Sequence, residues 1–237
     1  MVILGPMIYV CIYFLEMPFF EKYKVCDEPW PWKVDKDKWK SLLRESLLLL
    51  SVNYGVISPI FSFINYVVGI PVPFDFSIEG LPSAPKFFAQ MVFCAVFEDL
   101  WFHFSHRLMH TKWLYENVHK LHHKHIQTVF YSTNTQHPLD FTLVSAIAMF
   151  VGGQILGKHM HIMSFIGWCI VRELEGLDAH CGYEFSWSPY RWLPFATSHG
   201  YHAFHHLNSV GNYSSFFHIW DTVFGTNKAY DHFLAGL

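Results

Sequence analysis

The sequence predicts an all-α integral membrane protein with about four to five membrane helices and a cytosolic, histidine-rich cap that holds two metals. Three observations carry this prediction. Apolar residues make up 52% of the 237 residues and charged residues only 15%, against about 25% charged in a typical soluble domain. Five apolar stretches approach the roughly 20 residues that a helix needs to span a bilayer. Eight of the 17 histidines lie in three tight groups.

The five apolar stretches cover residues 2–20, 46–70, 87–104, 139–157 and 160–178. The first lacks the basic start and the small-residue cleavage site of a signal peptide, so we expect an anchor. Gly55, Pro59 and Gly69 interrupt the second, which predicts a kink or a re-entrant turn. Glu98 and Asp99 follow the apolar part of the third, so we expect its helix to leave the bilayer near them.

Basic residues indicate how the chain is oriented. If all five stretches cross, 13 lysines and arginines fall on one side of the membrane, and the opposite loops hold only Lys86 and Lys158. The positive-inside rule places the richer side in the cytosol. We therefore expect residues 1–104 to form N-terminal membrane helices. Residues 105–237 then form the histidine-bearing region, which includes a membrane hairpin at about residues 139–178.

Composition also narrows the classes of function. The formal net charge of −3 gives no indication of nucleic-acid binding. The five cysteines are scattered, and none form a CxxC pair. They therefore predict reduced, structural thiols rather than a disulfide framework or a thiolate metal site.

Three short motifs hold the clustered histidines: HRLMH with His106 and His110, HKLHH with His119, His122 and His123, and HAFHH with His202, His205 and His206. Spacings of three and four place side chains on one face of a helix, one turn apart. Each motif can therefore aim two or three imidazoles at one point. Imidazole suits Zn, Cu, Fe and Ni, so the ligand type leaves the metal open. Eight imidazoles exceed the needs of one ion, and they predict two metals with about four or five nitrogen ligands each.

Two acidic residues are candidates for orienting these histidines, because a metal-bound imidazole usually donates its other N–H to a carboxylate or carbonyl. Asp99 begins a helical stripe that continues through His103, His106 and His110, so it is expected to orient His106 or His103. The alternative is a simple acid at the membrane interface. Asp178 is close enough in sequence to support the region around His180.

With these motifs and the segments EDLWFHFSHRLMH, QHPLD, LDAHCGYE, GNYSS and WDTVFGT, the chain resembles the fatty acid hydroxylase/sterol desaturase superfamily. Within it, residues from about 22 to 230 resemble the C-4 methylsterol monooxygenases. The resemblance implies a non-haem di-iron monooxygenase in the endoplasmic reticulum membrane, with its catalytic cap in the cytosol. Its implied cofactors are two iron ions, O2 and electrons from NAD(P)H through cytochrome b5 or its reductase. Its implied reaction is oxidation of the C-4 methyl group of 4-methylsterols, a step of sterol biosynthesis.

The resemblance also implies which residues bind the metals: His106, His110, His119, His122, His123, His202, His205 and His206, with His180 as a further ligand. His137 matches a family position, where it is either a ligand or a support for one. The last motif departs from the family pattern at Tyr201 and Ala203, and His103 replaces an aromatic residue. We expect the nearby His199 to be no ligand, because it does not fit the motif's spacing.

Other functions remain open at this point. One is a hydroxylase or desaturase of another lipid, such as a fatty acyl chain or a sterol ring, and another is a family member without catalytic activity. A metal transporter is a third, but it would place its histidines at the membrane midplane, whereas these follow the apolar stretches. A bis-histidine haem protein is a fourth, and it would leave most of the imidazoles unexplained.

Overall fold

The computed structural model describes residues 4–70 and 72–236, which form helices and loops without a β-sheet. Helices α1 to α13 follow one another in the order Leu4–Leu15, Pro18–Glu21, Pro31–Val34, Lys36–Val52, Ser58–Val67, Ala84–Met109, Lys112–Asn117, Pro138–Asp140, Ile147–Leu156, Ile162–His180, His199–Asn208, Ile219–Phe224 and Lys228–Ala235. Two π-helices join α-helices end to end: η1 (Asn53–Ile57) joins α4 to α5, and η4 (Phe141–Ala146) joins α8 to α9. The described residues also contain four short 3₁₀ helices: η2 (His119–Lys124), η3 (Phe130–Asn134), η5 (Gly157–His159) and η6 (Pro189–Trp192).

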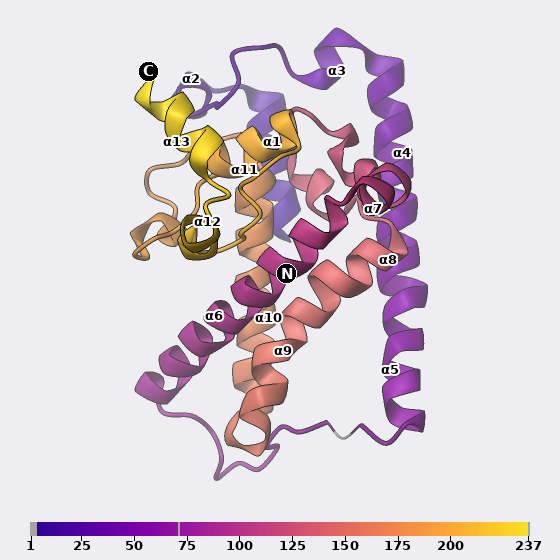
Figure 1. Cartoon of the computed structure of the whole chain (residues 1–237), viewed down its shortest axis with the longest axis vertical. Coiled ribbons are helices and arrows are strands. Elements are labelled where there is room, and N and C mark those ends of the chain that lie inside the picture. Colours follow the sequence, from indigo (N-terminus) through magenta and orange to yellow (C-terminus); the bar gives the residue numbers. More distant parts are fainter. Residues whose placement is uncertain (1–3, 71, 237) are drawn as a thin grey trace.

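Long helices run up and down the molecule (Figure 1). Among the described residues, three are long and apolar enough to cross a membrane: Lys36–Val67, Ala84–Met109 and Pro138–His159. Helix α6 alone has 26 residues, which corresponds to a length of about 39 Å. The chain is thus a helical membrane protein, as the sequence predicts.

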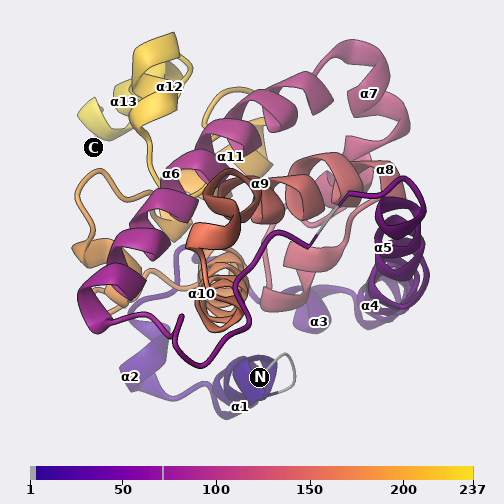
Figure 2. The same cartoon turned by 90° about the horizontal axis from the view of Figure 1, so that it is seen from below.

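The other two apolar stretches correspond to α1 and α10. The described part of α1 has 12 residues, fewer than the roughly 20 that a bilayer requires. Helix α10 has 19 residues, but it carries charged side chains at Arg172, Glu173, Glu175 and Asp178. Figure 2 shows α10 at the centre of the helices, between α1, α6 and α9. Among the described residues, three helices therefore qualify as spans by length and composition. Helix α10 is not among them because it turns polar where it enters the protein interior, and the described part of α1 is too short.

The second apolar stretch does not form a re-entrant turn. Helix α4 continues through the π-helix η1 into α5, as one helix of 32 residues. Pro59 lacks the backbone N–H that a regular α-helix would use at this point, and the wider turn of η1 immediately precedes it. The helix ends at Val67, and Gly69 then takes a left-handed conformation with φ of 72°.

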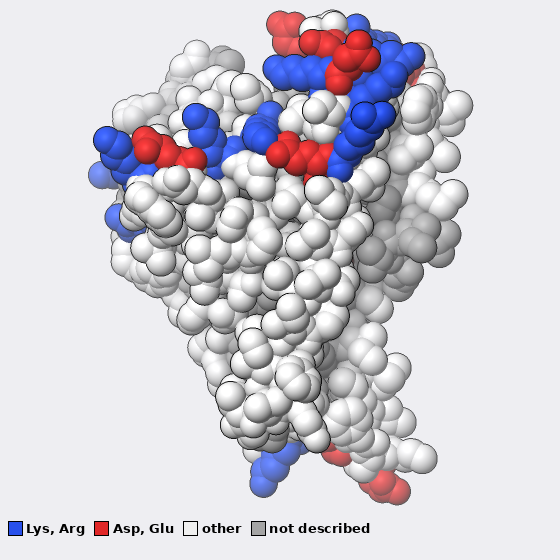
Figure 3. Space-filling model, turned by 90° about the vertical axis from the view of Figure 1, so that its right-hand side faces the viewer, with Lys and Arg blue, Asp and Glu red and all other residues white. Residues whose placement is uncertain are grey.

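Charged side chains gather at one end of the molecule, which we call the cap end, and a broad uncharged belt lies below them (Figure 3). Between residues 46 and 97 the only charged residues are Asp75, Glu79 and Lys86. The belt is the surface that a bilayer requires, since charged side chains are costly in its core. Which compartment the cap end faces stays a prediction from the basic residues.

The cap end includes α2, α3, the start of α4, α11, α12, α13 and the short helix η2, and it packs directly on the long helices. One core cluster joins residues from both predicted regions: Phe74, Met91, Cys94, Ala95, Met160, Phe165, Trp168 and Phe216. The predicted boundary after residue 104 lies inside α6. At the N-terminal side, the Tyr13 hydroxyl donates to the Cys181 carbonyl at 2.7 Å and so attaches α1 to the end of α10.

Helices α6 and α9 approach closely at Gly152, where a Cβ atom would lie 2.7 Å from the Cα of Cys94. Gly152→Val should therefore lower the free energy of unfolding by about 1–3 kcal/mol, because the helices must separate to fit the side chain. Thermal unfolding in detergent measures this. Gly55→Ala is the control, because a Cβ atom there meets nothing within 4 Å. Equal melting temperatures for the two variants would contradict the close approach.

Candidate metal centre

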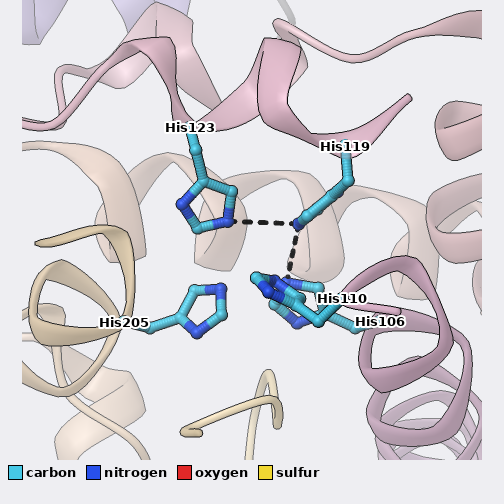
Figure 4. Close-up of side chains that lie close together, drawn as sticks. All are labelled: His106, His110, His119, His123 and His205. Carbon is cyan, nitrogen blue, oxygen red and sulfur yellow. Dashed lines mark hydrogen bonds between the residues drawn. The ribbon is translucent and has the colours of Figure 1, made fainter. Parts of the chain in front are cut away.

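All nine histidines that we predicted as ligands lie in two groups. The first group is His106, His110, His119, His123 and His205, and the second is His122, His180, His202 and His206. Within each group, one ring nitrogen per residue lies within 4.8 Å of the corresponding nitrogens of the others. Figure 4 shows the first group converging from α6, η2 and α11. All nine rings are buried except that of His110, which is partly buried.

The two HxxHH motifs divide their histidines between the groups in a crossed pattern. In the motif of η2, His119 and His123 join the first group and His122 joins the second. In the motif of α11 the assignment is reversed, because His202 and His206 join the second group and His205 joins the first. In α11 the two residues four apart share a face of the α-helix and therefore share a group. The η2 motif lies in a 3₁₀ helix, and there too the histidines four apart share a group. Each HxxHH motif thus contributes histidines to two adjacent groups.

Helix α11 has well-defined ends around its motif. The Ser198 hydroxyl accepts a hydrogen bond from the Tyr201 amide at 3.0 Å, which satisfies one of the unpaired amides of the first turn. Ser209 ends the helix in a left-handed conformation with φ of 55°. The ten residues between them hold every histidine of the last motif.

Hydrogen bonds at Nδ1 fix the orientation of four rings. In the first group, Nδ1 of His106 contacts the Tyr213 carbonyl at 2.9 Å and Nδ1 of His205 contacts the Gly211 carbonyl at 2.6 Å. In the second group, Nδ1 of His180 contacts a carbonyl oxygen of its own helix, that of Gly176, at 2.9 Å. A carbonyl oxygen only accepts, so Nδ1 of each ring carries the proton and Nε2 keeps its lone pair.

The fourth ring, that of His119, donates from Nδ1 to the Asp140 carboxylate at 2.7 Å. Nε2 of His119 lies 3.1 Å from Nε2 of His106. With both protons held at Nδ1, two lone pairs face each other there, and no proton is available to form a hydrogen bond. Nε2 of His205 is buried without a hydrogen-bond partner among the described residues. Converging lone pairs without protons are the donor set that a metal cation requires, so the residues present fit a metal ion.

Burial also keeps these rings neutral. Loss of hydration, followed by repulsion from neighbouring imidazoles, lowers the pKa of His122, His202 and His206 well below the ordinary value. The same causes lower the pKa of His123 to about 2. A neutral imidazole is the form that binds a metal.

One loop, residues 209–216, supports the first group. Besides its Gly211 and Tyr213 carbonyls, it places the Ser209 hydroxyl 3.3 Å from Nδ1 of His123. Two buried acids hold the amides of this loop. Asp221 accepts from the amides of residues 213 and 214 at 2.9 and 2.8 Å. Asp99 accepts from the amides of residues 215 and 216 at 2.8 and 2.9 Å.

The expected contact of Asp99 with His106 or His103 is therefore absent from the hydrogen bonds of the described residues. Asp99 instead holds the loop whose Tyr213 carbonyl orients His106. His103 lies outside both groups, with Nδ1 3.5 Å from Asp221 and 3.3 Å from the Ser214 hydroxyl. Both residues thus support the loop rather than a metal ligand directly.

His137 and Asp178 also differ from expectation. The ring of His137 accepts from the Leu139 amide at the start of α8 and joins neither group. Asp178 pairs with Arg191 at 2.9 Å rather than with His180. The acid that does orient a clustered histidine is Asp140, which the sequence analysis missed. It lies three residues after His137 in the quoted segment QHPLD, and that spacing on a helix start was the available signal.

The two residues that depart from the family pattern have different surroundings. The Tyr201 hydroxyl donates to Asp221 at 2.8 Å and so supports the same loop. Ala203 is half-buried and offers no metal-binding atom. His199 is buried, contacts the Ala179 carbonyl at 2.7 Å through Nδ1 and joins neither group.

The chain is similar to known proteins over most of its length. Residues 91–226 match the family described as fatty acid hydroxylase. Methylsterol monooxygenase 1 of Danio rerio is 33% identical over 222 residues, which cover 91% of this chain and 72% of the relative. Methylsterol monooxygenase 2-1 of Arabidopsis thaliana is 35% identical over 187 residues, which cover 73% of this chain and 64% of the relative. Very-long-chain aldehyde decarbonylase GL1-11 of Oryza sativa subsp. indica is 34% identical over 197 residues, 81% of this chain and 70% of the relative. No solved structure matches the chain.

Two double variants in α11 test the crossed pattern. His202→Ala with His206→Ala removes two of the four nitrogens of the second group and none of the first, so bound metal should fall from about two ions per chain to about one. His205→Ala with His206→Ala removes one nitrogen from each group, so both sites should weaken together instead. Metal titration followed by elemental analysis distinguishes the two outcomes. The same titration curve for both variants would contradict the pattern.

The stability of the metal-free protein should depend on pH. The unfolded chain takes up protons at the ordinary histidine pKa of 6.5, whereas the folded rings of His122, His202 and His206 resist protonation. Their contribution to stability is therefore present above pH 6.5 and is lost as the pH falls below it. Melting temperatures in detergent with a chelator, from pH 8 to pH 5, should decrease. A variant with all three histidines changed to alanine should show a shallower decrease, and a melting temperature that rises on acidification would refute the prediction.

Proposed function

The chain belongs to the fatty acid hydroxylase family, and on that premise we propose that it is a membrane-bound monooxygenase that oxidises the C-4 methyl group of 4-methylsterols. The proposed enzyme uses two non-haem iron ions, O2 and electrons from NAD(P)H that arrive through cytochrome b5 or its reductase. It resides in the endoplasmic reticulum membrane, with the cap end in the cytosol. The nine histidines of the two groups are the proposed ligands.

The observation that carries this proposal is the pair of neighbouring imidazole groups, with lone pairs directed inward. An unactivated methyl C–H bond offers nothing that an acidic or basic side chain can abstract at neutral pH, and a bound iron pair supplies O2 activation for such bonds. The protein holds the ligand nitrogens and excludes water. His119 is oriented by Asp140, and His106 and His205 are oriented by the loop 209–216.

The choice of a sterol is supported by relatives in a fish and a plant, both named methylsterol monooxygenases. A relative named very-long-chain aldehyde decarbonylase, which is 34% identical, favours a second candidate. In that candidate the same two groups act on the aldehyde end of a long acyl chain. The substrate therefore has to be decided by product analysis.

The structure offers less support to the other classes. A haem takes two axial histidines and would leave seven of the nine without a role. In a transporter, the ligands would lie at the midplane of the spans. Here His106 and His180 lie in the last turns of α6 and α10, His110 directly follows α6, and the other ligands lie in the cap end.

The experiment is a turnover assay on protein purified in detergent, loaded with iron and supplied with O2 and a reductant. A 4-methylsterol should give the 4-hydroxymethyl product and more oxidised forms, and chelation of the iron should abolish turnover. The variant with both His119→Ala and His123→Ala should lower the rate by at least about 100-fold, because it removes two nitrogens of the first group. His159→Ala, a histidine outside both groups, is the matched control. A product from a long-chain aldehyde and none from the sterol would select the second candidate.

A further inference from the structure

Three polar side chains meet at a point where three cavities adjoin. The Tyr54 hydroxyl donates to Glu173 at 2.9 Å and lies 3.2 Å from the Asn134 side-chain oxygen. Tyr54 belongs to the π-helix η1, Asn134 ends η3, and Glu173 lies in α10. We call these three residues the polar latch.

The first cavity, of about 60 Å³, adjoins the second histidine group through His122, His180 and His202, and all three latch residues line it. The second is an apolar groove of about 650 Å³ between α1, α4, η3 and α10. Asn134 and Glu173 line this groove as well. The third, of about 190 Å³, lies between η1, α5, η4 and α9, and Glu173 reaches it too. The carboxylate of Glu173 thus lies at the boundary of all three.

The apolar groove has the size of a binding site for a rigid lipid. Pockets for small molecules usually measure about 300–1,000 Å³, so a ring system fits in the groove. The 60 Å³ cavity beside the histidines is too small for rings, and it admits only the end of such a molecule. Apart from the latch, the groove is lined mainly by apolar side chains of the long helices, such as Leu47, Ile166 and Leu174.

Glu173 is the unusual member of this lining. The neighbouring Arg172 is engaged by Glu98 at 2.5 Å and by Glu175 at 2.9 Å. Among the hydrogen bonds of the described residues, the only one to the Glu173 carboxylate comes from the Tyr54 hydroxyl. Glu173 is half-buried, and this single hydrogen bond leaves most of the acceptor capacity of its carboxylate free. A ligand that reaches this point therefore gains by offering a hydroxyl group.

We propose that the groove binds a hydroxylated ring lipid and that Glu173 and Asn134 select it by its hydroxyl group. The hydroxyl donates to the Glu173 carboxylate and accepts from the Asn134 amide, while the Tyr54 hydroxyl holds Glu173 before the ligand enters. This inference rests on the proposed function, because a 4-methylsterol carries its hydroxyl on the carbon next to the methylated one. With the hydroxyl at the latch, that methyl group enters the small cavity at His122, His180 and His202. A plain acyl chain leaves Glu173 without its partner and is disfavoured.

The test is a binding measurement on the metal-free, full-length protein in detergent. A radiolabelled 4-methylsterol is displaced by the same sterol, by its 3-deoxy analogue or by a saturated fatty acid. The wild-type protein should prefer the hydroxylated sterol over the deoxy analogue by at least about tenfold, because the analogue cannot form the hydrogen bonds with Glu173 and Asn134 that the hydroxyl group forms. Glu173→Leu should remove this preference, and Glu173→Gln, whose amide still forms hydrogen bonds, should keep most of it.

Two further variants separate recognition from general damage. Tyr54→Phe removes the hydroxyl that holds Glu173 but leaves the carboxylate, so the preference should remain. Glu116→Leu makes the same substitution at an exposed position of α7 and should also leave the preference in place. Equal binding of the two sterols to the wild-type protein, or loss of preference in Tyr54→Phe equal to that in Glu173→Leu, would overturn the latch.

Turnover of the iron-loaded protein, measured in parallel, reports the proposed function separately. Selective sterol binding without oxidation supports the latch and refutes the proposed function. Oxidation without preference for the hydroxyl refutes the latch alone. If the labelled sterol does not bind at all, both proposals are wrong.

Discussion

The arrangement of the histidines depends on one property of the imidazole ring. A ring presents a lone pair at one nitrogen only when its proton is held at the other, and a buried N–H needs an acceptor. His106, His119, His180 and His205 each have one, and these acceptors come from parts of the chain far apart in sequence. The orientation of the rings therefore depends on the segments that supply these acceptors, which are the loop 209–216, α8 and the last turns of α10.

The buried acids form the next layer of the same arrangement. Asp99 and Asp221 bind four successive amides of the loop 209–216, and Tyr201 donates to Asp221. Burying a carboxylate is costly, but several donors at hydrogen-bond distance offset that cost. The polar interior of the cap end is thus continuous from the imidazoles to the acids, although a largely uncharged belt lies directly below it.

Much of this organisation is readable from the sequence, because it follows from local spacing. The apolar stretches predict the long helices, and the HxxHH spacing predicts that the histidines converge. The contacts of Asp99, His137 and Asp178 were not predictable, because they depend on where a distant loop or arginine lies. Asp140 lies in the segment QHPLD, but its contact with His119 was not predictable, because the two residues come from different elements. The division of the histidines into two groups was not predictable from the sequence, because each HxxHH motif contributes histidines to both groups.

The crossed pattern of the HxxHH motifs has a mechanical consequence. His122 and His123 are neighbours in the chain and belong to different groups, as are His205 and His206. The separation of the two centres is therefore set by peptide geometry, with consecutive Cα atoms about 3.8 Å apart. A rotation of η2 or α11 that brings one centre toward its ligand moves the other centre as well. The two groups are therefore mechanically coupled through the backbones of η2 and α11.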